Sequence, residues 1–443
     1  MATGSSPERL ATIVMATNAN QMTNIALRRV EGRNFFETRS FELGTSSLFA
    51  ICIPLAIMLR EGAHLSLFFS ALSNLGAVLL ATHARSSLAS FPGLSAGRAI
   101  IPTVMGAHFA MLFAVLMLRL PYSRSALLLG LIAHLLVVMI RFRATMRRRE
   151  SIGILPVGRT DRLPDDPRID WRPMNVPTIE EARRHGALVA DLNGHVPHEW
   201  ERFMTEAALQ GIIIYQAKEL TESLTGRVEP ERLGENGFST LMPARAWFHI
   251  KGLSDRIFAM VALILFALPM IVIAVLVRRD SPGPALFRQV RAGHAGAPFT
   301  AYKFRTMRMI DDDGNRSIKD AQTVDDDARI TALGRTLRRT RLDELPQLIN
   351  VLRGEMSLIG PRPEPKVLVD WYQDELPFYR LRHVVKPGIT GWAQVNQGHV
   401  NGLDQAQVKL HYDFYYIKYF SPWLDVIILF RTIATMLGRK NVR

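Results

Sequence analysis

Two adjacent acids, Asp343 and Glu344, are the side chains of this sequence best suited to chemistry. They lie in RLDELPQLINVLRGEMSLIGPRP, residues 341–363. The segment LDELPQLINVL predicts a helix that begins at or just before Asp343, because proline is tolerated in a first helical turn and Pro346 therefore limits how early the helix can start. The positive end of the helix dipole and the neighbouring arginines are expected to keep both carboxylates ionised. These arginines are Arg335, Arg338, Arg339, Arg341, Arg353 and Arg362.

An ionised aspartate in such surroundings has two chemical uses. It can attack phosphorus as a nucleophile, or it can bind Mg²⁺. Adjacent helical residues point about 100° apart, so Asp343 and Glu344 are expected to perform two tasks rather than to form one clamp. Taken alone, an Asp-Glu pair at a helix start more often caps the helix than catalyses a reaction, and the surrounding sequence must decide between the two.

Three basic segments predict a substrate that carries several phosphate charges. YKFRTM, residues 302–307, predicts an edge strand with Lys303 and Arg305 on one face. GPRP holds Arg362 between two prolines, which presents the fork-shaped guanidinium stiffly. KPGITGW places glycines beside Lys386, and such a turn brings backbone N–H groups close to an anion. A solvated basic face would explain each segment alone, but together with the acid pair they favour phosphate chemistry.

The composition of the 443-residue chain indicates a membrane protein. There are 54 Lys and Arg against 40 Asp and Glu, a formal net charge of +14, which suits nucleic acid, an anionic membrane or an anionic substrate. Mean hydropathy is nevertheless +0.09, so apolar residues are concentrated in segments, and we expect a membrane-lipid partner and no nucleic acid. The single cysteine, Cys52, allows no intramolecular disulfide, which fits a cytosol-facing chain. Residues 1–42 have no signal-peptide pattern and predict a cytoplasmic segment.

Four apolar stretches follow, each with about the 20 residues that cross a hydrocarbon core. The alternative is two or three spans and a buried core helix. Arginines before the first stretch, and in RFRATMRRR after the fourth, place both ends in the cytoplasm, so the short connection REGAH would face outward. The stretches predict a four-helix transmembrane bundle within residues 43–149, near 43–59, 64–82, 99–118 and 125–141.

Residues 150–244 alternate short apolar runs with helical patterns, which predicts a small α/β domain with a parallel sheet, similar to a degenerate Rossmann-like domain. The expected strands are SIGILPVG, GALVADL and GIIIYQ, and the expected helices are TIEEARRHG and HEWERFMTEAALQ. The loop PVGRTDRLP lacks the spaced glycines of a nucleotide site, so a structural or regulatory role is expected. Residues 227–240 are expected to be a linker.

The last predicted domain, residues 245–443, begins with an apolar run at 257–277. Its length allows a fifth span, but basic residues flank both ends, which favours the cytoplasm for both. Pro269 removes a helical hydrogen bond near the middle of the run and favours a kink. We therefore expect a re-entrant helix hairpin, broken at Pro269, that dips into one leaflet. Residues 421–441 are expected to form an interfacial helix, with a core helix of the soluble domain as the alternative.

From about Lys251 to Arg443 the chain resembles the bacterial sugar transferases, the monotopic phosphoglycosyl transferase superfamily. With the predicted bundle and α/β domain, the whole chain is similar to the large members that start exopolysaccharide or O-antigen assembly. The resemblance implies a catalytic α/β domain on the cytoplasmic face of a bacterial inner membrane. Its motifs occur in the family's order and spacing: GPALFRQVRAG (283–293), FTAYKFRTM (299–307), RTRLDELPQLINVLRGEMSLIGPRP (339–363) and VKPGITGWAQVN (385–396).

The resemblance implies a ping-pong reaction on polyprenyl (undecaprenyl) phosphate. Asp343 would attack the β-phosphorus of a UDP-sugar, form an aspartyl-phosphosugar and release UMP, and Glu344 would assist the attacking lipid phosphate. Mg²⁺, held in part by Asp343, would neutralise the diphosphate. Lys386 and Thr390 lie in the loop expected to receive the nucleotide end. The positions that match the family's phosphate-binding residues are Lys303, Arg338 and Arg362.

Two departures from the family pattern change what is expected. The family hairpin often has a serine before its proline, whereas this chain has Leu268, so Pro269 is expected to bend the helix alone. After AQVN the chain reads QGHVNG instead of a short glycine-and-basic sequence. The contacts of that loop with the sugar or nucleotide are therefore expected to differ.

Two other functions are compatible with the sequence. DDDG (311–314) and DDDAR (325–329) offer the letters of an Asp-x-Asp metal site, as in a glycosyltransferase that releases UDP, although a solvated acidic loop explains them as well. A catalytically inactive membrane scaffold that regulates polysaccharide assembly is disfavoured by the presence of Asp343 and Glu344. The resemblance favours UDP-glucose or UDP-galactose, and it leaves open other sugars and the formation of a homodimer.

Overall fold

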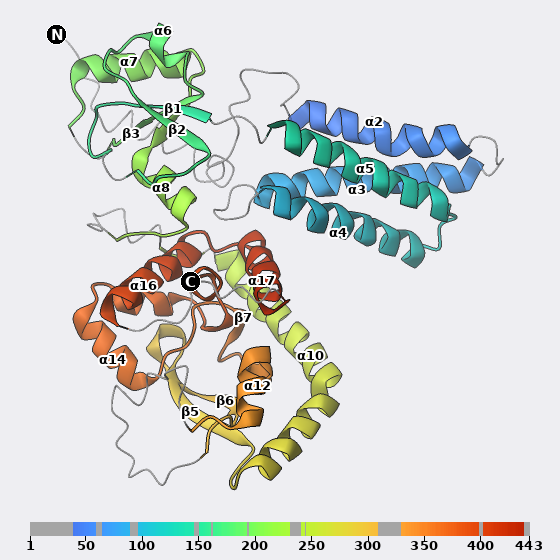
Figure 1. Ribbon diagram of the computed structural model, residues 1–443, viewed down its shortest axis with the longest axis vertical. Coiled ribbons are helices and arrows are strands. Elements are labelled where there is room, and N and C mark those ends of the chain that lie inside the picture. Colours follow the sequence, from blue (N-terminus) through green and yellow to red (C-terminus); the bar gives the residue numbers. More distant parts are fainter. Residues whose placement is uncertain are drawn as a thin grey trace. The chain divides into compact units, whose positions relative to one another are not determined.

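The chain divides into two compact units, Met1–Gly226 and Arg227–Arg443 (Figure 1). The division lies upstream of the predicted boundary after residue 244. Residues 1–38, the connection at 59–63 and most of the predicted linker lie outside the described part of the chain. The computed structural model describes residues 39–58, 64–88, 96–145, 150–160, 163–192, 195–230, 241–243, 245–308, 329–397 and 402–437.

Four helices of the first unit coincide with the four predicted apolar stretches and lie side by side in Figure 1. Three of them contain segments long and apolar enough to cross a membrane: Leu65–Ser86, Ile100–Met117 and Arg124–Ala144. The apolar part of the first helix, Phe41–Ala56, is shorter. The four helices are α2 (Arg39–Met58), α3 (His64–Leu88), α4 (Ala96–Met117) and α5 (Arg124–Thr145).

Asn74 of α3 connects three helices of this bundle through hydrogen bonds. Its Nδ2 donates to the carbonyl oxygens of Ala50 in α2 and Ala126 in α5, at 3.2 Å each. Gly130 leaves the necessary space, since a Cβ there would lie 2.0 Å from Asn74 Nδ2. A buried amide that pairs with backbone on two neighbouring helices is a typical device for packing apolar helices closely.

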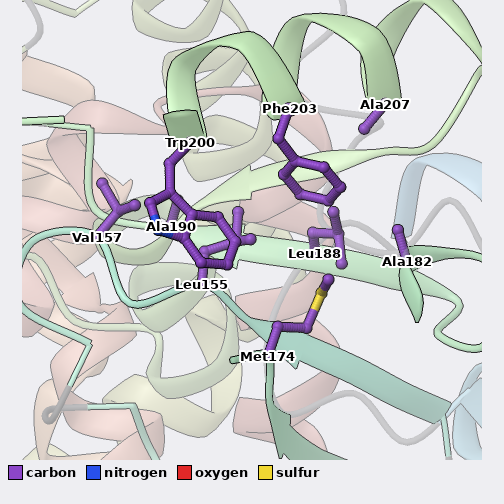
Figure 2. Close-up of a cluster of buried hydrophobic side chains, with 9 residues drawn as sticks. All are labelled: Leu155, Val157, Met174, Ala182, Leu188, Ala190, Trp200, Phe203 and Ala207. Carbon is purple, nitrogen blue, oxygen red and sulfur yellow. The ribbon is translucent and has the colours of Figure 1, made fainter. Parts of the chain in front are cut away.

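The α/β part of the first unit is a four-stranded parallel sheet in the order β2-β1-β3-β4, as predicted in its parallel direction. Strand β2 was not predicted from the sequence, because IDWRP is short and carries two charges. One face of the sheet is covered by α7, whose Trp200 and Phe203 pack on Leu155 and Leu188 (Figure 2). The elements are β1 (Glu150–Ile154), β2 (Ile169–Pro173), α6 (Ile179–Ala182), β3 (Ala187–Ala190), α7 (His198–Leu209), β4 (Ile214–Gln216) and α8 (Ala217–Thr225).

The second unit combines short strand pairs with helices. Strands β5 (Leu286–Ala292) and β6 (Pro298–Phe304) form an antiparallel hairpin, and β7 (Ser357–Ile359) pairs in parallel with β8 (Gly388–Thr390). The helical elements are α10 (Arg245–Asp280), η4 (His294–Gly296), α12 (Ala332–Thr340), η5 (Leu342–Gln347), α13 (Leu348–Arg353), α14 (Lys366–Glu375), η6 (Tyr379–Val384), α15 (Trp392–Asn396), α16 (Leu403–Lys418) and α17 (Pro422–Leu437).

Helix α10 contains the predicted apolar run and continues through Pro269 without interruption. The sequence analysis expected a break there, whereas Figure 1 shows one helix that bends along its length. Ala259, before the proline, packs in a cluster with Val351, and Ile273, after it, packs in a cluster with Leu337. Leu345 of η5 contacts both clusters, so both halves of the helix pack against the segment that carries the acid pair.

Two apolar surfaces of this unit remain open. In α10, Ile264, Leu265 and Leu268 are each at least 70% exposed, and Ala246–Asp280 is long and apolar enough to cross a membrane. Helix α17 buries Leu424 and Ile427. Its other face exposes Leu429, Phe430, Ile433 and Met436. This helix therefore combines the two alternatives considered for it, since one face belongs to the core and the other is free to meet lipid.

Candidate active site

The acid pair lies in a tight turn between two helices. Arg341, at φ 58°, ends α12 in the left-handed region and precedes η5. As predicted, the helical segment begins just before Asp343, and it is a 3₁₀ turn with Pro346 inside it. Asp343 is 8% and Glu344 5% exposed, so both carboxylates are largely withdrawn from water.

Two cationic side chains of the site donate hydrogen bonds to Glu344. Its Oε1 accepts hydrogen bonds from Lys303 Nζ at 2.8 Å and from Arg362 Nη2 at 2.9 Å, and Arg341 Nη1 lies 4.0 Å away. Burial alone would raise the pKa of Glu344, but the charges of Arg362 and Lys303 outweigh it and hold that pKa far below its ordinary value. Glu344 is therefore a fixed anion whose Oε1 is shared by two cationic donors.

The pKa of Asp343 is shifted in the opposite direction. Burial, and then the charge of Glu344, raise its pKa above the ordinary value, although Lys303 and Arg362 act against this. Its Oδ1 is buried without a hydrogen-bond partner among the described residues. Arg362 and Arg341 act on the pKa of Asp343 in the expected direction, but burial and the charge of Glu344 outweigh them. A desolvated and unpaired carboxylate is more nucleophilic than a solvated one.

The pKa of Lys303 is also shifted by this arrangement. Burial, followed by the charge of Arg362, lowers the pKa of Lys303 to about 8, while Glu344 opposes the shift. The strand β6 brings this lysine to the site from forty residues upstream in the chain, since Lys303 and Glu344 are 41 positions apart. Lys303 is thus a cation that can lose its proton near physiological pH.

Two arginines, the buried Arg382 and the partly buried Arg291, hold the backbone of GPRP, which was not predicted from the sequence. Arg382 donates from Nη2 to the carbonyl oxygen of Arg362 at 3.0 Å, and Arg291 donates to that of Pro363. Asp413 holds Arg382 in turn through hydrogen bonds of 3.0 and 2.8 Å. The signal in the sequence was an aspartate isolated among aromatic residues in HYDFYY, since such a carboxylate needs a buried cation.

The other predicted site residues have their described contacts elsewhere. Arg338 donates from Nε to Thr306 Oγ1 at 2.9 Å, and Thr390 Oγ1 lies 2.7 Å from Thr432 Oγ1 of α17. Lys386 faces α10. Of the predicted phosphate ligands, the structure therefore brings Lys303 and Arg362 onto the acid pair.

One oxygen of Asp343 is also a suitable ligand for a metal ion. The unpartnered Oδ1 of Asp343 suits Mg²⁺, which prefers carboxylate oxygens together with water and substrate phosphate. Within the described residues there is no cluster of three or more His, Cys, Asp or Glu side chains that could hold a metal ion. The aspartates of DDDG and DDDAR lie outside the described residues. The residues present therefore fit a metal that would be shared between Asp343 and a phosphate substrate.

The site thus combines Asp343, whose Oδ1 has no partner among the described residues, with the cations Lys303 and Arg362 on the neighbouring Glu344. It lies beside the apolar helix α10. Comparison with known proteins identifies this arrangement. Residues 246–439, which contain every residue of the site, match the family model described as bacterial sugar transferase. An N-acetylgalactosaminephosphotransferase of Aeromonas hydrophila, named for UDP-N-acetylgalactosamine and undecaprenyl phosphate, is 41% identical over 356 residues, covering 80% of this chain and 83% of that protein.

The chain belongs to the bacterial sugar transferase family. Two further relatives match this sugar transferase over shorter stretches. A UDP-glucose:undecaprenyl-phosphate glucose-1-phosphate transferase of Xanthomonas campestris pv. campestris is 45% identical over 193 residues, 43% of this chain and 39% of that protein. The protein of the same name from Escherichia coli (strain K12) is 41% identical over 186 residues, 42% of this chain and 39% of that protein.

Proposed function

We propose that this sugar transferase moves a sugar 1-phosphate from a UDP-sugar to undecaprenyl phosphate and releases UMP. The observation that carries the proposal is the difference between the two acids, since Glu344 Oε1 accepts hydrogen bonds from Lys303 and Arg362 whereas Asp343 Oδ1 has no partner among the described residues. The names of the relatives support the donor and acceptor classes. Phosphoryl transfer depends on charge neutralisation and positioning, which this site offers.

In the first half-reaction, a carboxylate oxygen of Asp343 attacks the β-phosphorus of the UDP-sugar. A bond forms between that oxygen and phosphorus, the bond from the β-phosphorus to the bridging oxygen breaks, and UMP leaves with the electron pair. Burial and the missing hydrogen bond leave Asp343 poorly stabilised as an anion, which favours its attack. Arg362 and Lys303, which are held beside Asp343 by Glu344, supply positive charge to balance that of the diphosphate.

In the second half-reaction, an oxygen of the lipid phosphate attacks the phosphorus of the aspartyl-phosphosugar. The bond to Asp343 breaks and returns a free carboxylate, and the product is undecaprenyl diphospho-sugar. Glu344 holds the two cations at the reacting phosphorus and orders the approach of the lipid phosphate. Mg²⁺, bound by Asp343 together with substrate oxygens, would supply further neutralisation of the diphosphate charge.

We propose further that α10 enters the membrane from the cytoplasmic side and returns to it. Both halves of the helix pack on the same unit and surround Leu345, next to the acid pair. The exposed apolar residues of the helix run from Ile250 to Leu276 and are most exposed near its centre, at Ile264, Leu265 and Leu268, so this part suits the hydrocarbon core. Such a re-entrant helix keeps the site at headgroup depth on the cytoplasmic face of the inner membrane, where UDP-sugars are available.

The identity of the sugar is a separate proposal. The relative that matches over four fifths of this chain is named for N-acetylgalactosamine, whereas the two glucose-named relatives match less than half of it. UDP-N-acetylgalactosamine is therefore the first donor to test, with UDP-glucose and UDP-galactose as the donors favoured by the sequence motifs. UMP release from each donor in membranes that contain the protein and undecaprenyl phosphate measures the preference directly.

The decisive experiment for the reaction itself is Asp343→Asn. We expect this variant to release no UMP, because an amide cannot form the aspartyl-phosphosugar. Release of UDP instead of UMP by the wild-type protein would indicate a glycosyltransferase, and an absence of nucleotide release with all donors would indicate an inactive scaffold. Wild-type UMP release that persists in Asp343→Asn would refute Asp343 as nucleophile.

A further inference from the structure

A second pair of cations lies away from the acid pair, between α10 and the turn before β8. Lys386 Nζ lies 4.0 Å from the point where a Cβ at Gly252 would stand. The guanidinium of Arg256 lies against Gly354, where a Cβ would come within 2.4 Å of Nη2. The absence of a side chain at Gly354 thus provides the space that the Arg256 guanidinium occupies, and Lys386 reaches the face of α10 at Gly252.

The two cations are near one another and are not neutralised. After burial, the charge of Arg256 is the main influence that lowers the pKa of Lys386, and Asp255 opposes it. The carboxylate of Asp255 is engaged by Ser357 Oγ and lies 3.5 Å from Lys251 Nζ. Within the part of the chain that the structure describes, no carboxylate forms an ion pair with Lys386 or Arg256. Two neighbouring cations in this state favour the binding of an anion.

The position of Arg256 indicates which kind of anion the two cations bind. It is the last charged residue before the apolar run of α10, and the next two side chains, Ile257 and Phe258, are at least 50% exposed. Lys251, just upstream, pairs with Asp425 at the start of α17 at 3.0 Å, so two helices with exposed apolar faces meet beside these cations. Basic side chains at such a boundary are at the depth of lipid phosphates.

We propose that Arg256 and Lys386 bind the phosphate of a membrane lipid, and that the polyprenyl phosphate acceptor docks there before its phosphate reaches Asp343. This assigns Lys386 to the lipid, whereas the sequence motif suggested the nucleotide. The choice of acceptor rests on the proposed function, but the lipid-phosphate site itself does not. The site is distinct from Lys303 and Arg362, which are held by Glu344.

The test compares the full-length protein with the double variant Arg256→Gln/Lys386→Gln in phosphatidylcholine nanodiscs. The matched control, Lys366→Gln/Arg380→Gln, removes the same charge from exposed positions of the same unit. We expect the apparent KM for undecaprenyl phosphate to rise about tenfold or more in the double variant, because two charge-assisted contacts are lost. The KM for the UDP-sugar, kcat at saturating lipid and the isotope exchange of UMP into UDP-sugar should stay unchanged in both variants.

The competing anions are distinguished in the same assay. Phosphatidylglycerol added to the nanodiscs should raise the KM of the wild-type protein for undecaprenyl phosphate and should have little effect on the double variant. Inhibition by inorganic phosphate that is as strong as that by phosphatidylglycerol would overturn the lipid assignment. A rise in the UDP-sugar KM and a loss of UMP exchange in the double variant would also overturn it, because Lys386 would then serve the nucleotide.

A direct binding measurement separates this proposal from the proposed reaction. Retention of undecaprenyl phosphate by the detergent-solubilised protein, measured by native mass spectrometry, requires no turnover. If the wild-type protein transfers no sugar phosphate, the proposed function fails, while lipid retention that is lost in the double variant and kept in the control would still support the site. Equal retention by all three proteins would overturn the site, whatever the outcome of the activity assay.

Discussion

Lys303 and Arg362 donate to the same oxygen of Glu344, at 2.8 and 2.9 Å. This sharing divides the acid pair into an anchored carboxylate and an unpaired one, although the two residues are adjacent in the chain. Glu344 orders the cations, and Asp343 keeps an oxygen without a hydrogen-bond partner among the described residues. The cations therefore serve the nucleophile indirectly, by being held in place for the phosphates that it attacks.

The pKa of Lys303 predicts the alkaline side of the pH–activity profile. Because that pKa is lowered to about 8, Lys303 loses its charge as the pH rises through about 8, and one of the two cations on Glu344 is lost. UMP release should therefore decline with an apparent pKa near 8. Lys303→Arg should move this decline to higher pH, because a guanidinium stays protonated. An alkaline limb that is identical in the wild type and in Lys303→Arg would contradict the prediction.

Glu344→Gln should shift the acid side of the same profile. The charge of Glu344 raises the pKa of Asp343, and its removal also frees Lys303 and Arg362 to act on Asp343. The pKa of Asp343 should therefore fall, and the acid limb of UMP exchange should move to lower pH while kcat drops. Glu344→Asp is the control, since it keeps the charge. A limb that moves to higher pH in Glu344→Gln would refute this arrangement of charges.

The division of labour between the acids shows where prediction from sequence ended. The pattern LDELPQ was sufficient to predict a helical turn beginning before Asp343, because proline and two acids at a helix start are local signals. Which acid takes the positive charge depends on Lys303, from a strand 41 positions away. Periodicity and capping rules contain no such distance, so the sequence predicted the same ionised state for both acids and did not separate them.

The same limit explains the outcomes for Pro269 and Lys386. A proline in an apolar run predicts a disturbance, but whether the helix breaks or only bends depends on the packing of its two halves, here around Leu345. The KPG motif predicted a cation near an anion, and the structure places Lys386 beside α10. Local chemistry was predictable, whereas the partner that each side chain meets was determined by tertiary structure.

The ion pair between Arg382 and Asp413 predicts a large loss of stability in Asp413→Asn. Both side chains are at most 3% exposed, and loss of the carboxylate leaves a buried guanidinium without its counter-charge, at a cost of about 3–5 kcal/mol. The exposed pair of Lys366 and Asp370 provides the control, because Asp370→Asn should cost at most about 1 kcal/mol. Thermal unfolding in detergent compares the two. Equal stability of both variants would show that the buried pair does not support the GPRP backbone.

Gly388→Ala should damage the site through the backbone alone. A Cβ at Gly388 would lie 2.0 Å from the amide nitrogen of Gly360 and 2.6 Å from the carbonyl oxygen of Thr390. Strands β7 and β8 would have to separate, and Gly360 begins the GPRP segment that presents Arg362. We expect a stability loss of about 3 kcal/mol or more, together with a fall in kcat of at least about tenfold, since a small misplacement of a positioning group has effects of this size.

Gly296→Ala is the matched control for that substitution. Gly296 has φ +78°, but nothing lies within 4 Å of its Cβ position, so only the left-handed strain of about 1–2 kcal/mol should appear, with kcat preserved. Thermal unfolding and UMP release measured on both variants separate strain from collision. A Gly388→Ala protein as stable and active as Gly296→Ala would mean that the approach of the two strands does not position Arg362 at Glu344.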